Sequence, residues 1–379
     1  MDILVPRFVD QDAIKAQELN AKELFKRFSQ AGQTWHLFSH SAPDPDVAAN
    51  PVARIHRLLC PIPAKYRSGA DKERFPKFSM KWEMFLRYQG GYDAIFYPDG
   101  KKYDLWALAL RSLQGRHIPI IATVEGLAGT EKQERRFSEY IGHHVHLDRP
   151  AMPRRKSYLE LADHVIAISP LLKKYVEFFY HKPCTVLPLG VDLTIFNDKN
   201  RDEPDRPRII CAGTLNDRKR PELFMRMARR FPQADFVWFG CGPKHAALEH
   251  ERKAGGMENL SFPGSTPPRQ LAEEMRHASV FVLPSSSEGW GKVVQEAAAC
   301  GLPSIVFGFY ETPLVTHGEN GFVCWNDEEM MENLARLVED AKLRRDMGAA
   351  AAAGARELSW DKVAPQWEKH VLDLIGEFR

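Results

Sequence analysis

Short apolar segments alternate with helical patterns along most of this chain. Before residue 195, segments with strand composition occur at 2–5, 34–38, 55–59, 94–97, 118–123 and 164–168. Helical patterns at 13–29, 80–89, 104–113 and 155–161 fall between them. Such alternation is typical of a parallel sheet covered by helices on both faces. Ligands of these sheets bind at the carboxyl ends of the strands, so we expect functional residues in the loops that follow the strands.

A second series of the same kind begins at Arg208. Strands are predicted at 208–214, 235–240, 260–262, 280–283 and 304–307, and helices at 221–230, 246–254, 268–277 and 292–300. The preceding segment 198–207 (DKNRDEPDRP) is polar and contains proline, as linkers do. A chain of 379 residues is long enough for two domains with full cores. The predicted fold class is therefore α/β, with one domain at 1–198 and a second at 199–357.

The composition excludes several classes of protein. A hydrophobic content of 44% and a charged content of 27% are ordinary for a globular protein. The net charge of +2 gives no case for a nucleic-acid partner. The six cysteines include no Cys-x-x-Cys pair, which favours reduced thiols in a cytoplasmic protein over a zinc site or a disulfide framework. The sequence shows neither a run of 18 apolar residues nor a signal-peptide pattern.

The stretch 280–304 (VFVLPSSSEGWGKVVQEAAACGLPS) joins a predicted strand, a polar loop and a helix that stops at Gly301. Free backbone N–H groups and the helix dipole at such a junction favour a bound phosphate. Two carboxylates flank the junction, Glu288 in the loop and Glu296 in the helix. Eight helical residues span roughly 12 Å, which is about the reach from a sugar across a diphosphate to a ribose. The two glutamates either bind those sugars or are ordinary acids near a helix start.

The same stretch resembles the Glu-x7-Glu signature PSxxEGFGLxxxEAMAxGxPV of the retaining family 4 glycosyltransferases. The chain matches it at Pro284, Ser285, Glu288, Gly289, Gly291, Glu296, Ala297, Ala299, Gly301 and Pro303, with Trp290 at the usual Phe. Weaker similarity continues at 162–170, 186–196, 240–243 and 317–322. The resemblance implies the GT-B fold, in which two Rossmann-like domains face each other across a cleft. It also implies that the last segment, 358–379, crosses back onto the N-terminal domain.

The resemblance further implies which residues form the site. In the family pattern GRLxxxKG, an Arg and a Lys clamp the donor diphosphate. Lys219 aligns with that Lys, whereas Thr214 stands at the Arg position and Arg218 is the candidate second cation. The alternative is a solvated basic turn. The predicted catalytic residues are Glu288, Lys219, Arg218 and Glu125, and the predicted donor-binding residues are Gly213, Thr214, Gly240, Gly242, Gly289, Trp290, Gly291, Lys292, Val293, Glu296, Phe309, Tyr310 and Glu311.

Three loops depart from the family pattern. The Gly-Gly loop after the first strand is replaced by residues 7–10 (RFVD), and Glu125 stands where a His usually follows the fifth strand. Glu125 contacts either sugar hydroxyls or local N–H groups. In the loop that replaces GGxPE, Leu314 stands at the Glu position, and the backbone from Phe309 to Glu311 is expected to contact the donor sugar. The acceptor half of the site is therefore not a standard copy.

The implied activity is transfer of a hexose from a UDP- or GDP-linked sugar to a hydroxyl of a saccharide or lipid-linked acceptor. Retention at the anomeric carbon, independence of metal ions and the absence of a cofactor other than the nucleotide-sugar co-substrate are implied as well. The expected role is synthesis of cell-surface polysaccharide or glycolipid. The alternatives are a catalytically silent sugar-nucleotide-binding protein, or another GT-B enzyme such as an epimerase or a sugar phosphorylase.

Three further patterns leave structural alternatives. Residues 44–46 (DPD) superficially resemble a DxD metal site, but the Pro-rich loop around them predicts a turn. His143, His144 and His146 lack an acidic partner at helical spacing, so a loop or acceptor-cleft position is predicted rather than a metal site. The segment 75–88 mixes basic and aromatic residues and is either a buried helix with a basic edge or a peripheral contact with the inner face of a membrane.

Overall fold

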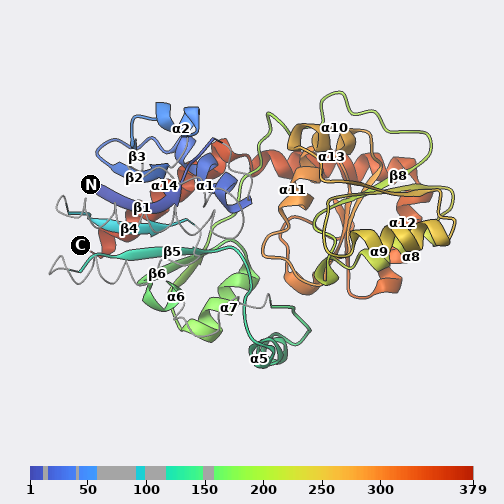
Figure 1. Cartoon of the computed structure of the whole chain (residues 1–379), viewed down its shortest axis with the longest axis horizontal. Coiled ribbons are helices and arrows are strands. Elements are labelled where there is room, and N and C mark those ends of the chain that lie inside the picture. Colours follow the sequence, from blue (N-terminus) through green and yellow to red (C-terminus); the bar gives the residue numbers. More distant parts are fainter. Residues whose placement is uncertain (12–15, 40–41, 58–90, 99–116, 148–157, 379) are drawn as a thin grey trace, which may run out of the picture. The chain divides into compact units, whose positions relative to one another are not determined.

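The computed structural model describes residues 1–11, 16–39, 42–57, 91–98, 117–147 and 158–378. Two parallel sheets with helices form the protein, which confirms the predicted α/β class (Figure 1). The helices predicted at 80–89 and 104–113, and the mixed basic and aromatic segment 75–88, lie outside the described residues. In the part of the chain that the structure describes, no helix is long and apolar enough to cross a membrane.

The first sheet has seven strands in the order β3-β2-β1-β4-β5-β6-β7, and every neighbouring pair is parallel. The strands are β1 (Asp2–Phe8), β2 (Thr34–Ser39), β3 (Ala53–Arg57), β4 (Ala94–Tyr97), β5 (Ile120–Val124), β6 (His164–Ala167) and β7 (Cys184–Val186). The described helices next to them in the chain are α1 (Ala16–Arg27), α2 (Pro45–Ala49), α6 (Tyr158–Leu161) and α7 (Pro170–Tyr180). Strands β4 and β5 are buried throughout, as expected for a sheet covered on both faces.

The second sheet has six parallel strands in the order β10-β9-β8-β11-β12-β13. They are β8 (Arg208–Ala212), β9 (Asp235–Phe239), β10 (Leu260–Gly264), β11 (Val280–Leu283), β12 (Ser304–Phe307) and β13 (Gly321–Cys324). The helices between and after them are α8 (Pro221–Arg230), α9 (His245–Ala254), α10 (Pro268–Arg276), α11 (Lys292–Ala299), α12 (Asp327–Glu339) and α13 (Ala341–Glu357). Both sheets have the strand order of the Rossmann fold, which reverses direction between the first and fourth strands.

The chain divides into two compact units that are each discontinuous in sequence. Unit 1 contains Met1–Glu125, Met152–Gly190 and Trp360–Arg379, and unit 2 contains Gly126–Ala151 and Val191–Ser359. Sequence analysis placed the boundary at residue 198 and assigned all of 1–198 to the first domain. The difference is largest at residues 126–151, which include helix α5 (Glu131–Ile141) and cluster with unit 2.

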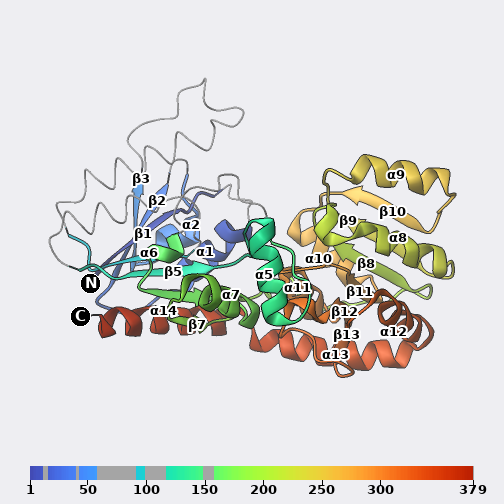
Figure 2. The same ribbon diagram turned by 90° about the horizontal axis from the view of Figure 1, so that it is seen from below.

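The last helix, α14 (Trp360–Glu377), packs against α1 in unit 1 (Figure 2). Its buried Glu368 accepts hydrogen bonds from the backbone N–H groups of Ser29 (2.8 Å) and Gln30 (3.1 Å), just beyond the end of α1. Asp361 accepts a hydrogen bond from Arg27 at 2.5 Å. The C-terminal helix is thus bonded to the start of the chain through a carboxylate whose oxygens are both satisfied.

Helix α13 crosses the C-terminal end of α11 through a stripe of small residues. The tract 348–355 (GAAAAAGA) places Gly348, Ala351, Ala352 and Ala355 on the buried face at helical spacing. A Cβ atom at Gly348 would lie 2.2 Å from the carbonyl oxygen of Gly301. Gly354, in the same helix, is exposed, and a Cβ atom there would meet nothing within 4 Å.

This pair of glycines allows a matched test of helix packing. We expect Gly348→Ala to lower the free energy of unfolding by about 2–4 kcal/mol, because backbone must move to relieve the contact. Gly354→Ala should raise it by about 0.5–1 kcal/mol, because alanine loses less conformational entropy in a helix than glycine does. Urea unfolding followed by circular dichroism measures both changes. A Gly348→Ala variant as stable as the wild type would contradict the close packing of α13 on α11.

Candidate functional site

The two loops at the reversal point of the second sheet carry the strongest sequence candidates. Strand β8 lies beside β11, and the loops that follow them are residues 213–220 and 284–291. In open parallel sheets ligands bind outside the carboxyl ends of the strands where the strand order reverses. The structure therefore places the Lys219 loop and the Glu288 loop together at the position where the fold favours a ligand.

The loop after β8 is held by its own polar residues. The Asn216 side chain accepts a hydrogen bond from the backbone N–H of Lys219 at 3.0 Å and caps a short 3-10 helix, η4 (Asp217–Lys219). The carbonyl oxygen of Arg218 accepts from the backbone N–H of Ser286 at 2.8 Å. These bonds fix the side chains of Lys219 and Arg218 relative to the neighbouring loop.

Glu288 is a buried carboxylate paired with two cations. Its Oε1 lies 2.6 Å from Lys219 Nζ, and its Oε2 lies 3.0 Å from Arg218 Nη1. Lys219 is buried as well, whereas Arg218 is partly exposed and also donates to the carbonyl oxygen of Ser287 at 2.7 Å. Burial alone would raise the pKa of Glu288, but the charges of Lys219 and Arg218 outweigh it and hold the pKa at about 2. Three of the four predicted catalytic residues are thus in direct contact.

Glu296 has the opposite environment. It lies in α11, partly buried, and no described residue donates a hydrogen bond to its carboxylate. Burial raises the pKa of Glu296 to about 7, and the positive charge of Lys292 one turn earlier only partly opposes this shift. The pKa values of the two glutamates of one motif therefore shift in opposite directions, because Glu288 contacts two cations whereas Lys292 only partly offsets the burial of Glu296.

Glycines at the carboxyl ends of β8 and β9 allow the loops that follow these two strands to come into contact. A Cβ atom at Gly240 would lie 2.1 Å from the carbonyl oxygen of Gly213, and one at Gly242 would lie 2.4 Å from that of Leu215. Gly213 itself has φ +152°, and its Cα faces the side chain of Lys219. Close packing of backbone on backbone thus requires Gly240 and Gly242. Thr214, at the start of the loop, is exposed.

The start of α11 carries the other predicted donor-binding residues. Gly289 and Gly291 flank Trp290, whose indole N–H donates to Gln295 Oε1 at 2.9 Å in the buried side of the helix. Gly291 adopts φ +78° and supplies no side-chain cap to the helix. Lys292 and Val293 form its partly buried first turn. Trp290 therefore anchors the loop, and Gly291, the N-cap residue of α11, provides no side-chain acceptor for the first N–H groups of the helix.

The loop after β12 forms a short 3-10 helix, η5 (Gly308–Tyr310). Tyr310 is fully buried, and burial raises the pKa of its hydroxyl well above the usual value, helped by the nearby Glu288 charge. Phe309 stacks on Phe307 with ring centroids 4.9 Å apart. Glu311 ends the turn in a left-handed conformation with φ +49°. Sequence analysis predicted backbone contacts here and missed the fact that His143 donates to the Phe309 carbonyl oxygen at 2.7 Å.

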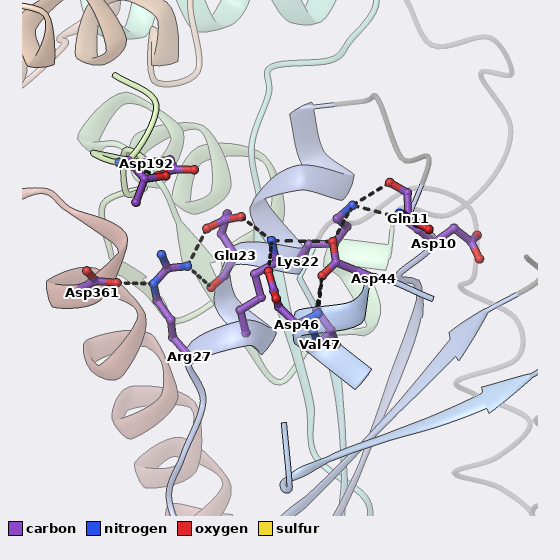
Figure 3. Close-up of polar contacts among 12 residues, drawn as sticks. Asp10, Gln11, Lys22, Glu23, Arg27, Asp44, Asp46, Val47, Asp192 and Asp361 are labelled. Carbon is purple, nitrogen blue, oxygen red and sulfur yellow. Dashed lines mark hydrogen bonds and ion pairs between the residues drawn. The ribbon is translucent and has the colours of Figure 1, made fainter. Parts of the chain in front are cut away.

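Glu125, the predicted catalytic residue of the first domain, lies in unit 1. Glu125 follows β5 and accepts a hydrogen bond from the Asn20 side chain of α1 at 3.2 Å, so it has a local partner. The buried Lys22, also on α1, lies 3.0 Å from Asp44 Oδ2 and donates to the carbonyl oxygens of Asp10 (3.2 Å) and Gln11 (3.3 Å) (Figure 3). This cation joins the loop after β1, where the family resemblance implies a Gly-Gly loop, to Asp44 at the start of α2.

The Asp44 segment begins the short helix α2, where sequence analysis predicted a turn. Asp44 caps α2, its Oδ1 accepting from the backbone N–H groups of Asp46 (3.2 Å) and Val47 (3.4 Å). Burial disfavours the charged carboxylate, yet Lys22 and Lys26 keep the pKa of Asp44 lowered. Among the described residues, no group of three or more His, Cys, Asp or Glu could hold a metal ion.

Comparison with known proteins identifies the family. Residues 194–353 match the model described as Glycosyl transferases group 1, and residues 17–195 match Glycosyltransferase Family 4. A D-inositol 3-phosphate glycosyltransferase of Paenarthrobacter aurescens is 30% identical over 47% of this chain and 49% of that protein. Its counterpart from Arthrobacter sp. (strain FB24) is 27% identical over 90% and 83%. The chain spans about half the length of the first of these relatives.

Solved structures show the same fold. Sucrose-phosphate synthase from Thermosynechococcus elongatus superposes with a TM-score of 0.72 at 20% identity, over 99% of both chains. Anabaena Alr3699/HepE, solved in complex with UDP and glucose, superposes with a TM-score of 0.69 at 14% identity, over 98% of this chain and 100% of that one. The chain belongs to the family 4 glycosyltransferases and has the GT-B fold.

The opposite environments of Glu288 and Glu296 predict opposite effects on stability. The raised pKa of Glu296 stabilises the fold below about pH 4.5, and this stability is lost as pH rises towards 7. The lowered pKa of Glu288 stabilises the fold above about pH 4.5, and this is lost as pH falls towards 2. We therefore expect Glu296→Gln to raise the free energy of unfolding relative to the wild type. This gain should be about 1–3 kcal/mol larger at pH 8 than at pH 5.

Urea unfolding at the two pH values measures this difference. The control is Glu319→Gln, because the side chain of Glu319 is exposed and forms no hydrogen bond or ion pair with a described residue. Its effect on unfolding should be the same at pH 5 and pH 8. A Glu296→Gln effect that is equally independent of pH would contradict a raised pKa at Glu296.

Proposed function

We propose that this protein is a retaining glycosyltransferase that moves a hexose from a nucleoside-diphosphate sugar to an acceptor hydroxyl. The observation that carries the proposal is the buried contact of Glu288 with Lys219 and Arg218 at the reversal point of the second sheet. An ionised carboxylate and two cations at this position match the two parts of a sugar diphosphate, its hydroxyls and its phosphates. Ordinary stability does not require such a pair, because burying ions is costly.

Donor binding exchanges the partners of these charges. Without donor, Lys219 and Arg218 neutralise Glu288. The donor diphosphate is a better partner for both cations, since it carries more charge and more acceptor oxygens. The carboxylate oxygens of Glu288 are then free to accept hydrogen bonds from sugar hydroxyls. The existing ion pair thus keeps all three side chains in position without leaving a buried charge uncompensated.

In the proposed reaction, the bond from the anomeric carbon to the diphosphate oxygen breaks and its electron pair goes to the leaving diphosphate. The acceptor oxygen forms its bond on the same face, and its proton passes to a leaving phosphate oxygen. The negative charge that grows on the diphosphate is stabilised by Lys219, Arg218 and the N–H groups at the start of α11. No protein base and no resident cofactor is required in this scheme.

The other donor contacts follow from the positions of the remaining residues. Glu296 is a partly buried carboxyl with no described donor, so a pair of ribose hydroxyls would satisfy it. The peptide groups from Phe309 to Glu311 would contact the sugar. The glycines at 213, 240 and 242 would let backbone approach the nucleotide, in addition to packing on one another. Glu125 is assigned to the acceptor side in unit 1.

The proposed donor nucleotide is UDP or GDP. A structural neighbour, Alr3699/HepE, is described in complex with UDP-glucose. For the acceptor, relatives are named D-inositol 3-phosphate glycosyltransferase and alpha-galactosylglucosyldiacylglycerol synthase, the latter 27% identical over 45% of this chain. These names support a hydroxyl of a saccharide or lipid-linked acceptor, in glycolipid or polysaccharide synthesis. A cytoplasmic location, with peripheral contact to the inner face of a membrane, is part of the same proposal.

A donor screen tests the proposal directly. We expect one sugar nucleotide among UDP-, GDP- and ADP-sugars to raise the melting temperature and to be turned over, because ligand bound to the native state stabilises it. Glu288→Gln should lower kcat by about 100-fold or more, while the nucleoside diphosphate still binds. Lys219→Met should weaken binding of the sugar nucleotide and of the nucleoside diphosphate. NMR of the product should show the anomeric configuration of the donor. Donor binding without turnover would instead favour a silent sugar-nucleotide-binding protein.

The response to chelation is a separate expectation. Because Lys219 and Arg218 are placed to neutralise the leaving diphosphate, transfer should continue in excess EDTA at the rate measured without it. The assay compares initial rates with EDTA, with added Mg²⁺ and with added Mn²⁺. Loss of activity in EDTA that a divalent ion restores would overturn metal independence and leave the transferase assignment intact.

A further inference from the structure

The chain leaves unit 1 after Glu125, and residues 126–147 belong to unit 2, where they contact the donor loops. The preceding residue, Glu125, ends β5 of unit 1, and the chain returns to unit 1 at Met152. Sequence analysis predicted a loop or acceptor-cleft position for the histidines of this segment. The structure places these histidines in a turn after α5, and it bonds the segment to two of the loops assigned above to donor binding.

Helix α5 and the turn that follows it are well defined by their own hydrogen bonds. Thr130 and Gln133 form a capping box, and Gly142 ends the helix with φ +83°. The turn then folds back on the helix. Glu134 Oε2 accepts from the backbone N–H of Leu147 at 2.8 Å, and Ser138 Oγ accepts from that of Val145 at 3.0 Å. These hydrogen bonds therefore fix the His143–His146 turn relative to α5.

Two hydrogen bonds join this turn to the donor loops. His143 Nε2 lies 2.7 Å from the carbonyl oxygen of Phe309, and Ser287 Oγ donates to the carbonyl oxygen of His146 at 2.9 Å. The His143 ring also contacts the aromatic rings of Phe309 and Trp325, each with centroids 6.2 Å apart. Ser287 immediately precedes Glu288. One turn of the α5 segment thus fixes both the Glu288 loop and the η5 loop.

The bond to Phe309 sets the direction of a peptide group. A carbonyl oxygen only accepts, so His143 donates this hydrogen bond from its Nε2–H. In a planar trans peptide the C=O and N–H groups point in opposite directions. Because the Phe309 carbonyl points to His143, the N–H of Tyr310 points away from α5. This N–H belongs to the backbone segment that the proposed function assigns to the donor sugar.

We propose that His143 is a positioning residue that orients the Phe309–Tyr310 peptide for the donor sugar. The inference rests on the proposed function for its consequence in catalysis, and on the hydrogen bonds of His143 and His146 to the donor loops for its geometry. Without His143 the peptide is free to rotate, and the loop must be ordered when donor binds. Binding then costs more free energy, while the reacting groups Glu288, Lys219 and Arg218 are unchanged.

The chain offers both a rescue variant and a matched control. A glutamine side chain can place its amide N–H₂ near the position of His Nε2, so His143→Gln should restore the bond to Phe309. His144 is the adjacent histidine, exposed and without a partner among the described residues. We expect His143→Ala to raise the donor KM about 3- to 10-fold with a smaller change in kcat and in acceptor KM. His143→Gln and His144→Ala should both stay within about twofold of the wild type.

Hydrogen exchange of the donor-free protein tests the geometry independently of activity. The amide of Tyr310 and its neighbours at 308–311 should exchange faster in His143→Ala than in the wild type, His143→Gln or His144→Ala. If the wild type binds no sugar nucleotide, the proposed function fails, and the exchange result still decides whether His143 holds this loop. Unchanged exchange at 308–311, or a donor KM that changes equally in His144→Ala, would overturn the inference.

Discussion

The buried contact between Glu288 and its two cations is the interaction on which the rest of the site depends. A carboxylate removed from water strongly prefers to be neutral unless opposite charge lies close by. Lys219 at 2.6 Å and Arg218 at 3.0 Å keep Glu288 ionised at a depth where it would otherwise hold a proton. The pair can form only because β8 and β11 are adjacent and both of their loops emerge at the same edge of the sheet.

The position of these charged side chains has its own structural requirements. Glycines at 240 and 242 let the loop after β9 pack against the backbone of Gly213 and Leu215 in the loop after β8, and Asn216 caps the turn that presents Lys219. On the other side, Trp290 anchors the Glu288 loop to Gln295 of α11. Each of these residues acts on the position of the charged groups and need not itself touch a ligand. Their packing explains how the side chains of Glu288, Lys219 and Arg218, which are flexible or unfavourable to bury, are kept in one arrangement.

Because the two units are discontinuous in sequence, segments that lie far apart along the chain contribute to the site. Residues 126–151 cluster with unit 2 although the chain on either side of them belongs to unit 1. The last helix is bonded to the start of the chain through Glu368 and Asp361. The chain therefore passes between the units at four places, and the donor loops are bonded to the segment that directly follows Glu125 of unit 1.

The sequence by itself determined the alternating strands and helices and the fold class, because periodicity is a local property of the chain. Its resemblance to a family pattern indicated the family and named Glu288, Lys219 and Arg218 as site residues. It could not separate Glu288 from Glu296, since their opposite pKa shifts arise from neighbours that lie far away in sequence. Nor could it reveal the burial of Lys22 with Asp44 or the bond from His143 to Phe309, whose partners are 22 and 166 residues apart. Those contacts were decided by the tertiary structure, because only the folded chain brings such residues within hydrogen-bond distance.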